Sequence, residues 1–366
     1  MKILIVGAGP TGLSAALNAG KEGNEVFVFE KDSKLGSKIC GEALAREALD
    51  FVSMKPSKKF INREVQGFRM TFKGKFIREA KFKNSATAPG YLIDKPMFLH
   101  LLKQETEKFG VKVYFNAQVE KVDPRSGKIG LRTGEIVQGD LVICADGYGS
   151  VARKHLDYTS FDTALSAQIR CSLPEGLDPE YLHLDIIGEG YTWTFVKKES
   201  CNVGVGLPAN ACSREFLSTH LSKQVERLGV EPLSRVVFAP VSMGGPLENF
   251  ENGKMVVSGE AAGCVMPLSG EGIRFGIYGG SIAHKPKSRT QFMKKYGRNM
   301  ERSRKMLRLV RNLNDQERTD FLRSLENPLE VLEGQLPRIE DLSTRAKLLA
   351  KVIIMASHRS KRVKLN

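Results

Sequence analysis

The chain opens on a short apolar run that leads directly into three spaced glycines. Residues 4–6 are typical of a buried strand, and Gly7, Gly9 and Gly12 follow in the spacing G-x-G-x-x-G. In this spacing the first glycine permits a tight turn, the second allows a ligand to approach the backbone, and the third lets a helix pack close to the sheet. The pattern therefore predicts a strand, a turn and a helix from Thr11 to about residue 21.

A carboxylate closes the second apolar run. Residues 26–29 predict another strand, and Glu30 follows at its end, where a carboxylate can accept both hydroxyls of an adenosine ribose. The start of the preceding helix offers free N–H groups to a pyrophosphate. An acid at this position disfavours a 2′-phosphate, so we expect the bound dinucleotide to be FAD or NAD rather than NADP.

The charge of the chain limits the kinds of partner that we expect it to bind. The chain has 366 residues, 41% of them hydrophobic, and a formal net charge of +15, most of which lies after His284. A basic segment suits nucleic acid, an anionic membrane, an acidic protein or a solvated helical surface. No zinc-ligand spacing, helix-turn-helix pattern or aromatic-basic strand accompanies the charge, so nucleic acid is not expected as a partner.

The cysteines and the N-terminal residues indicate the cellular compartment in which the protein is expected. The six cysteines form no C-x-x-C pair, so no metal site is expected. Met1 leads straight into the first predicted strand without a signal peptide, and no apolar run is long enough to span a bilayer. We therefore expect a cytoplasmic protein.

Alternating patterns predict an α/β fold with two sheets. Strands and helices alternate over residues 1–58, 84–160 and 250–290, which predict one discontinuous Rossmann-like domain with a parallel sheet. Residues 59–83 and 161–249 are rich in strand patterns and predict an antiparallel sheet domain that holds the substrate.

The C-terminal region, residues 291–366, is charged and predicts helices. Over residues 341–358 apolar side chains share one stripe of a helix with basic residues beside it, and a basic tail follows at 359–364. Such a helix lies in a membrane interface or docks onto the protein's own core. Peripheral contact with the inner face of the membrane is therefore one expectation for this region.

Three separated segments carry the motifs of one flavoprotein family. They are residues 7–12, the Ala145-Asp146-Gly147 run with Ser150 and Arg153, and Gly259-Glu260 followed by residues 267–273. With residues 38–42, 91–95 and 191–195 they resemble the geranylgeranyl reductase family of the flavoprotein hydroxylase-like superfamily. The resemblance covers residues 1–283 and implies an FAD-binding Rossmann-like domain and an enzyme that saturates isoprenoid chains.

The resemblance also implies the cofactor contacts. Glu260 takes the place of an Asp that hydrogen-bonds the ribityl chain, and Lys95 stands where many relatives have Arg, without the bidentate geometry of a guanidinium. Residues 270–273 are expected to open a helix whose N-terminus faces the flavin and stabilises its reduced, anionic form. The full set expected to bind FAD is Gly7, Gly9, Thr11, Gly12, Glu30, Lys31, Gly41, Glu42, Lys95, Val119, Asp146, Glu260, Gly270, Gly272 and Ile273.

Cys40 is the expected catalytic residue. In the family this cysteine lies beside the flavin ring at the entrance to the substrate cavity, where a thiol could donate a proton, relay one or gate access. The alternative is a small buried hydrophobe, because free cysteines are commonly buried. Gly41 permits a close backbone approach and Glu42 brings a carboxylate next to the thiol, which favours a functional role.

An aromatic strand is the expected lipid-binding surface. Tyr191, Trp193 and Phe195 alternate along the chain and so project to one face of a strand. Such a face usually belongs to a core, but the resemblance implies that it lines the lipid cavity. Val196 replaces the proline that the family usually carries here, so the strand is expected to continue.

The resemblance implies the reaction as well. Isolated C=C bonds of a geranylgeranyl or polyprenyl lipid would receive a hydride from flavin N5 and a proton from Cys40 or a water that it positions. The electrons would come from an external donor, NAD(P)H or ferredoxin. The alternatives are an aromatic-ring monooxygenase on the same scaffold, a non-redox cyclase, and a flavin-loaded lipid-binding protein without turnover.

Overall fold

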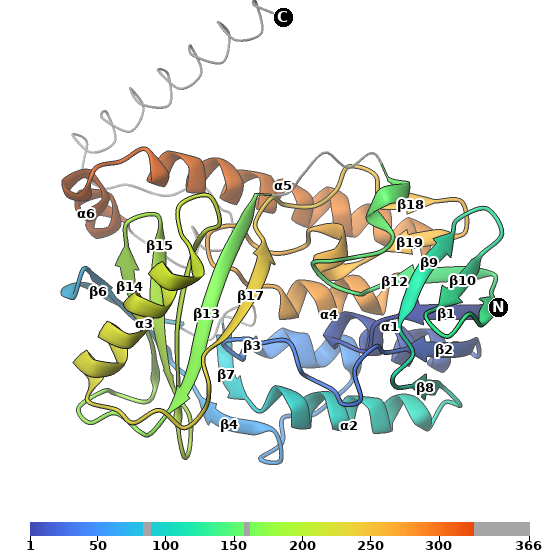
Figure 1. Ribbon diagram of the computed structural model, residues 1–366, viewed down its shortest axis with the longest axis horizontal. Coiled ribbons are helices and arrows are strands. Elements are labelled where there is room, and N and C mark those ends of the chain that lie inside the picture. The colour runs from blue at the N-terminus through green and yellow to red at the C-terminus, as the bar shows by residue number, and fades with distance from the viewer. Residues whose placement is uncertain (83–88, 157–161, 326–366) are drawn as a thin grey trace, which may run out of the picture.

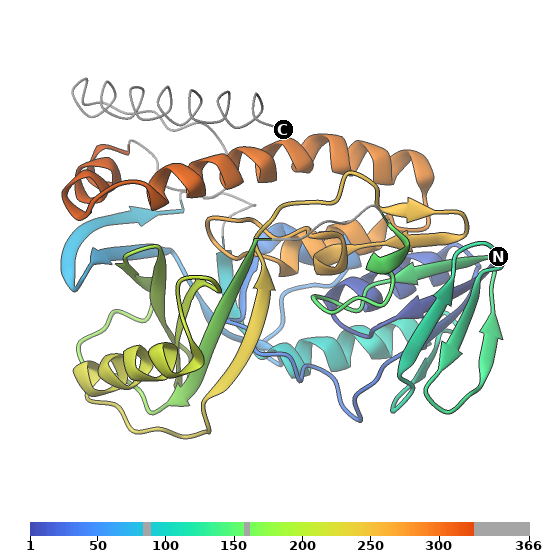
Figure 2. The same ribbon diagram turned by 45° about the horizontal axis from the view of Figure 1, so that its top comes forward.

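Two large β-sheets lie side by side in the computed structural model, which describes residues 1–82, 89–156 and 162–325 (Figure 1). The long helix α5 (Pro286–Arg311) runs along one edge of the molecule and continues into α6 (Asp315–Ser324) above the second sheet. Figure 2 shows the same relation from a second direction. The helix and tail predicted over residues 341–364 lie outside the described residues.

The first sheet is the predicted parallel sheet. Its order is β18-β19-β12-β1-β2-β8, and every neighbouring pair is parallel except β18 with β19. Segments far apart in the sequence therefore share one sheet. The strands are β1 (Lys2–Val6), β2 (Glu25–Phe29), β8 (Lys112–Tyr114), β12 (Leu141–Cys144), β18 (Glu251–Asn252) and β19 (Met255–Val257).

Both faces of this sheet are buried, as is usual for parallel strands. Ile3 and Ile5 belong to a core layer with the first two helices, whereas Leu4 and Val6 belong to a layer with a small antiparallel sheet and α5. The covering elements are α1 (Pro10–Lys21), α2 (Lys95–Glu107), α4 (Ile273–Ser281), β9 (Val119–Asp123), β10 (Lys128–Leu131) and β11 (Ile136–Gln138).

The second sheet has the order β17-β13-β16-β15-β14-β5-β6. Its neighbours are antiparallel, as predicted, except β14 and β5, which pair in parallel because β5 arrives from a distant part of the chain rather than through a hairpin. Helix α3 (Arg214–Leu228) covers one face. The strands are β5 (Gly67–Phe72), β6 (Lys75–Lys81), β13 (Thr163–Cys171), β14 (Tyr181–Ile187), β15 (Gly190–Val196), β16 (Cys201–Pro208) and β17 (Val237–Ser242).

Short elements join the two sheets. A three-stranded antiparallel sheet has the order β3-β7-β4, with β3 (Ala43–Ala45), β4 (Ile61–Glu64) and β7 (Pro89–Ile93). The 3-10 helices are η1 (Arg46–Val52), η2 (Arg153–His155) and η3 (Gly259–Ala262). None of the described helices combines the length and the apolar character needed to cross a bilayer.

Glycines bring α1 and α4 into close contact. A Cβ atom at Gly280 would lie 2.2 Å from the backbone oxygen of Thr11, and one at Gly276 would lie 2.5 Å from the Thr11 hydroxyl oxygen. Within the first turn, a Cβ at Gly12 would lie 1.8 Å from the carbonyl oxygen of Gly7. The two helices can therefore pack at this distance only because these positions lack side chains.

We expect Gly280→Ala to destabilise the protein by about 1–3 kcal/mol, since the added methyl meets backbone that cannot move aside. Gly297→Ala is the matched helical control, because its Cβ would lie 3.4 Å from a side-chain carbon of Pro246 and alanine is favoured in a helix interior by up to about 1 kcal/mol. Urea unfolding of both variants measures the difference. Equal stability of the two variants would contradict the close packing of α1 on α4.

Candidate functional site

The glycine turn leaves open space at the N-terminus of α1. Gly7 has φ +94°, and a Cβ there would lie 2.7 Å from the carbonyl oxygen of Ala145, so the turn excludes larger residues. At Gly9, by contrast, an added Cβ would meet nothing within 4 Å. Gly9 is the N-cap of α1 and provides no side-chain cap, so the first N–H groups of the helix face this space. The geometry fits the phosphates of a dinucleotide.

Glu30 lies over the same turn. Its Oε2 accepts a hydrogen bond from the N–H of Ala8 at 2.7 Å, and its Oε1 accepts one from the N–H of Asp32 at 3.0 Å. This position fits the predicted ribose contact. Lys31 is exposed beside it, and Val119 is buried at the start of β9, two residues after Ala117, whose N–H donates to the Glu30 carbonyl. Both assignments stay predictions.

The second cofactor segment contains an unpaired buried oxygen. Asp146 follows β12, and its Oδ2 accepts from the N–H of Val151 at 2.8 Å, whereas its Oδ1 is buried without a hydrogen-bond partner among the described residues. Burial raises the pKa of this carboxyl group above its ordinary value. A buried polar atom without a partner costs free energy, so Oδ1 fits a contact with a bound ligand.

The third segment contacts the first. Gly259 has φ +65°, and a Cβ there would lie 2.2 Å from the Thr11 hydroxyl oxygen. The carboxylate of Glu260 pairs with the ammonium of Lys38 and accepts from the N–H of Ser242 at 3.4 Å. The longer side chain at this position, where the family has Asp, is therefore held by an ion pair.

The predicted helix after this segment is present. Gly270 has φ +68°, and Gly272 is the N-cap of α4 without a side-chain cap, so α4 begins at Ile273 with free N–H groups. These groups provide partial positive charge. The arrangement agrees with the predicted contact between this helix and the flavin, which stays a prediction.

The Cys40 loop packs on the aromatic strand. A Cβ at Gly41 would lie 2.8 Å from a ring carbon of Phe195, so only glycine allows this approach. Glu42 has φ +66°, and its N–H donates to the Sγ of Cys40 at 3.3 Å. Cys40 itself is half-buried. The loop thus places the thiol next to the strand that carries the aromatic residues.

The aromatic residues share one face of β15, as predicted. The ring centroids of Tyr191 and Trp193 are 6.0 Å apart, and those of Trp193 and Phe195 are 6.5 Å apart. The Tyr191 hydroxyl donates to the carbonyl of Ser269 at 2.6 Å, and burial raises the pKa of Tyr191 to about 12. The strand continues through Val196, as expected. Tyr191 therefore connects the aromatic face to the loop that precedes α4.

Asn202 is a site residue that the sequence analysis missed. It is 4% exposed on β16, its Nδ2 donates to the carbonyl of Cys40 at 3.1 Å, and its Oδ1 accepts from the Trp193 indole N–H at 3.4 Å. One side chain thus holds both the thiol loop and the indole. The available signal was a polar residue inside an otherwise apolar strand pattern.

A chain of lysines surrounds the same loop. The ammonium of Lys197 pairs with Glu42 Oε2, and the backbone N–H of Lys95 donates to Glu42 Oε1 at 3.1 Å. The buried ammonium of Lys95 donates to the carbonyl of Lys38, whose own ammonium pairs with Glu260. Lys197 was not predicted. Within the described residues Lys95 contacts the loop, and its contact with FAD stays a prediction.

Arg274 is a second missed residue. Its buried guanidinium donates to both carboxylate oxygens of Glu271 at 2.8 and 2.9 Å and to Glu47 at 2.9 Å. Burial lowers the pKa of Arg274, but the two carboxylates outweigh burial and raise it above its ordinary value. The charged group fastens the first turn of α4 to η1.

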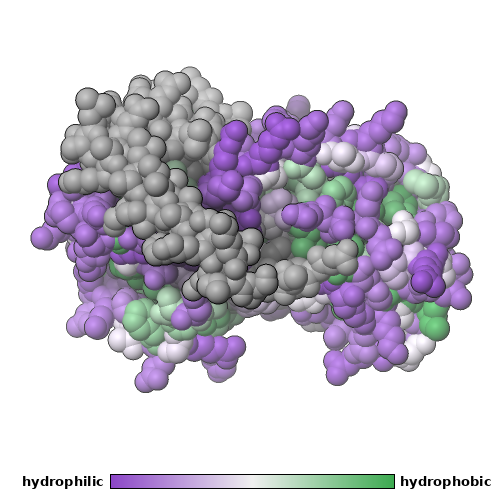
Figure 3. Space-filling view, turned by 90° about the horizontal axis from the view of Figure 1, so that it is seen from above, coloured by the Kyte–Doolittle hydropathy of each residue, from purple (hydrophilic) through white to green (hydrophobic). Residues whose placement is uncertain are grey.

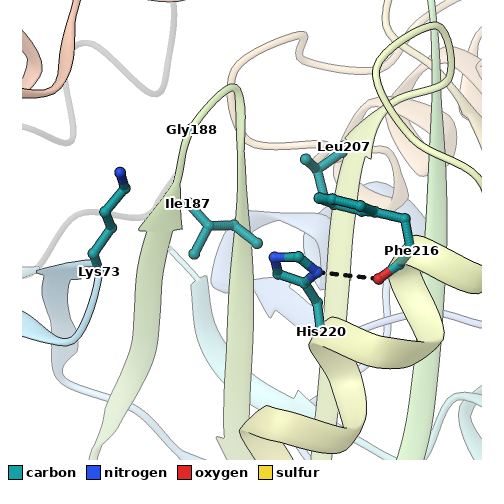
Figure 4. A pocket seen from close by; sticks show the side chains of 6 residues that line it. All are labelled: Lys73, Ile187, Gly188, Leu207, Phe216 and His220. Carbon is teal, nitrogen blue, oxygen red and sulfur yellow. Dashed lines mark hydrogen bonds between the residues drawn. The ribbon is translucent and has the colours of Figure 1, made fainter.

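A hollow of about 410 Å³ lies elsewhere, on the side of the second sheet that α3 covers (Figure 4). The ring of His220 stacks on Phe216 with centroids 4.1 Å apart, and both project from α3 toward the strands. Leu207 lines this hollow and belongs to the core layer under α3, whereas Trp193 and Phe195 belong to the layer on the other face. It is therefore separate from the Cys40 loop. Its lining residues are Lys73, Ile187, Gly188, Leu207, Phe216 and His220.

We expect Asn202→Leu to lower the free energy of unfolding by about 1–3 kcal/mol, because it leaves the Cys40 carbonyl and the indole N–H buried without partners. Trp193 is the only tryptophan, so its fluorescence maximum should shift in the same variant. Asn210→Leu, at an exposed position, is the control and should leave both measurements unchanged. An unaltered emission spectrum of Asn202→Leu would contradict the hydrogen bond between Asn202 and the Trp193 indole.

Comparisons with known proteins agree with this geometry. Residues 1–171 match the family described as FAD binding domain. The chain is 25% identical over 375 residues to a digeranylgeranylglycerophospholipid reductase of Methanococcus vannielii, covering 96% of this chain and 94% of that protein.

Solved structures share the fold. A geranylgeranyl bacteriochlorophyll reductase-like protein of Thermoplasma acidophilum superposes with a TM-score of 0.79 at 23% identity and covers 95% of each chain. A probable FAD-dependent monooxygenase of Pseudomonas aeruginosa superposes with a TM-score of 0.67 at 16% identity, over 88% of this chain and 99% of that chain. Residues 1–171 are therefore similar to known FAD-binding domains, and the predicted resemblance of the chain to geranylgeranyl reductases is confirmed.

Proposed function

We propose that this protein is an FAD-dependent reductase of isolated C=C bonds in the geranylgeranyl or polyprenyl chains of a lipid. The observation that carries the proposal is the packing of the Cys40 loop on the aromatic face of β15, which Tyr191 connects to the loop before α4. This arrangement places an exchangeable proton and an apolar wall next to the segments that fit the cofactor. The reductase of Methanococcus vannielii, which aligns over nearly the whole chain, supports the same activity.

The wall suits a hydrocarbon chain. Trp193 and Phe195 belong to a cluster with Phe68, Leu182 and Leu184, all without charge. Thr192 and Thr194, which alternate with the aromatic residues on β15, are also buried and point to the other face of the sheet, where the Thr194 hydroxyl accepts from Gln224. Polar contacts contribute no binding energy to an alkene, so an apolar surface that excludes water has to position it.

The residues that fit FAD have separate roles. The glycine turn and the N-terminus of α1 would hold the phosphates, Glu30 the ribose, and Asp146 and the N-terminus of α4 the flavin end. When bound and reduced, FAD supplies a hydride to one carbon of the double bond. Arg274 keeps the first turn of α4 in place through Glu47 and Glu271.

The other carbon of the double bond requires a proton. Cys40 Sγ accepts from the N–H of Glu42, so the thiol has a defined position. Asn202 joins the Cys40 carbonyl to the indole of Trp193. We assign the proton to this thiol or to a water that it positions. Each reduction consumes two electrons, so an external donor, NAD(P)H or ferredoxin, must reduce the cofactor again after each turnover.

An anaerobic assay tests the reaction. The protein with FAD is reduced chemically without oxygen and mixed with a geranylgeranyl lipid dispersed in detergent, and the lipid is analysed by mass. We expect two hydrogens to be added per double bond while the flavin returns to its oxidised spectrum. A strict need for oxygen would identify a monooxygenase. An unchanged lipid mass with an altered chromatographic retention would identify a cyclase, and a flavin that stays reduced would identify a lipid-binding protein without turnover.

Cys40→Ala should keep the yellow colour of bound FAD, but its rate of lipid reduction should fall by about 10²-fold or more. The reason is that general acid catalysis contributes about 10²- to 10⁴-fold to a rate. Cys212→Ala is the matched control, since Cys212 is also half-buried but lies after β16, where its Sγ contacts the carbonyl of Pro208. Single-turnover oxidation of the reduced flavin by lipid measures both variants. If Cys40→Ala oxidised its reduced flavin at the full rate, Cys40 would have only a packing role.

A further inference from the structure

Helix α5 carries a straight row of exposed cations. Lys287, Lys294, Arg298 and Lys305 are spaced by seven, four and seven positions and so fall on one side of the helix, with Arg302 beside them. All five are exposed. At 1.5 Å per residue the row extends for roughly 27 Å. We call these five residues the basic stripe.

The basic stripe is not neutralised. Within the described residues, Lys287, Lys294, Arg298 and Arg302 have no ion pair, and Lys305 approaches Glu301 only at 3.9 Å. Glu301 is the only acidic residue on α5. Four other cations of the helix are different, because each of these four has a carboxylate partner. They are Arg289 with Glu251, Arg304 with Glu301, Arg308 with Asp162, and Arg311 with Glu189.

We propose that the basic stripe holds the protein against an anionic lipid surface, an inference that rests on the proposed function because the substrate is a lipid. The exposed positions between the cations are polar, with Gln291 and Lys295 among them, so the helix can lie on phosphate headgroups without inserting into the hydrocarbon. Each cation near such a surface strengthens binding about fivefold, and the attraction falls within a Debye length.

The position of the stripe favours a membrane over an acidic protein as the partner. Helix α5 continues into α6, whose Leu322 packs on the cluster that contains Trp193 and Phe195. Lys73 of the β5–β6 turn pairs with Asp315 of α6, which fixes α6 to the second sheet. The helix that carries the stripe therefore continues into the helix that packs on the aromatic cluster.

Figure 3 looks onto the side along which α5 runs, and the part drawn in colour carries many hydrophilic residues with hydrophobic ones between them. A flat surface laid on this row of roughly 27 Å would meet all of the stripe at once, over about two thirds of the length of the helix. It would also meet the edge of the molecule along which α5 continues into α6. A lipid bilayer provides such a surface and is also the source of the lipid.

The test compares two fourfold variants of the full chain with FAD bound. The stripe variant is Lys287→Gln, Lys294→Gln, Arg298→Gln and Lys305→Gln. The control variant removes the same charge from exposed lysines on other faces, Lys121→Gln, Lys128→Gln, Lys198→Gln and Lys223→Gln. Co-sedimentation is measured with vesicles of equal phosphatidylglycerol and phosphatidylcholine, and with phosphatidylcholine alone, at low and high salt.

We expect the unaltered protein to bind the anionic vesicles in a salt-sensitive way and the neutral vesicles weakly. The stripe variant should bind at least tenfold more weakly, and the control variant within about threefold of the unaltered protein. Equal losses in both variants would mean that only net charge matters and would overturn the proposal. So would unchanged binding of the stripe variant, or no binding of the unaltered protein to anionic vesicles.

The outcome can be separated from that of the proposed reaction. With lipid dispersed in neutral detergent the stripe variant should keep its full rate, because the stripe does not touch the aromatic face or the Cys40 loop. Failure of the unaltered protein to reduce dispersed lipid would contradict the reaction and leave the vesicle result standing. If instead the stripe variant lost only its rate with an acidic protein donor, the stripe would be a protein-docking surface and the membrane proposal would be wrong.

Discussion

The close contact around Thr11 is the constraint on which the site depends. Gly259, Gly276 and Gly280 all approach this one residue at distances that exclude a Cβ atom. Because Thr11 lies in the first turn of α1, the contact brings the glycine turn, the η3 segment and α4 together around one small volume. A larger residue at any of the three glycines would push apart the segments that fit the phosphates and the flavin.

Local patterns were sufficient to predict the elements that make up this volume. The strand, glycine turn, helix and Glu30 carboxylate follow one another within thirty residues, so each depends on near neighbours that the sequence displays directly. The start of α4 after Gly272 was expected from the motif at residues 267–273, which resembles the geranylgeranyl reductase family. The alternation of Tyr191, Trp193 and Phe195 likewise fixes their common face without knowledge of the rest of the chain.

Contacts between distant segments could not be predicted in this way. Asn202 and Cys40 are 162 positions apart, and Lys197 and Glu42 are 155 apart, so neither pair leaves a local pattern. The parallel pairing of β5 with β14 depends on a crossover rather than on either strand's composition. The carboxylate of Glu47 reaches Arg274, 227 positions away, only because η1 packs beside α4.

The hydrogen bond from Tyr191 to Ser269 has a consequence for how two bound ligands affect each other's affinity. It fastens the strand that carries the aromatic face to the loop from which α4 starts, so the two surfaces share one bond. If a lipid chain restrains Tyr191, it restrains the neighbouring loop as well, and the entropy of ordering that loop is lost only once. Thermodynamic reciprocity then requires each ligand to raise the affinity for the other by the same factor.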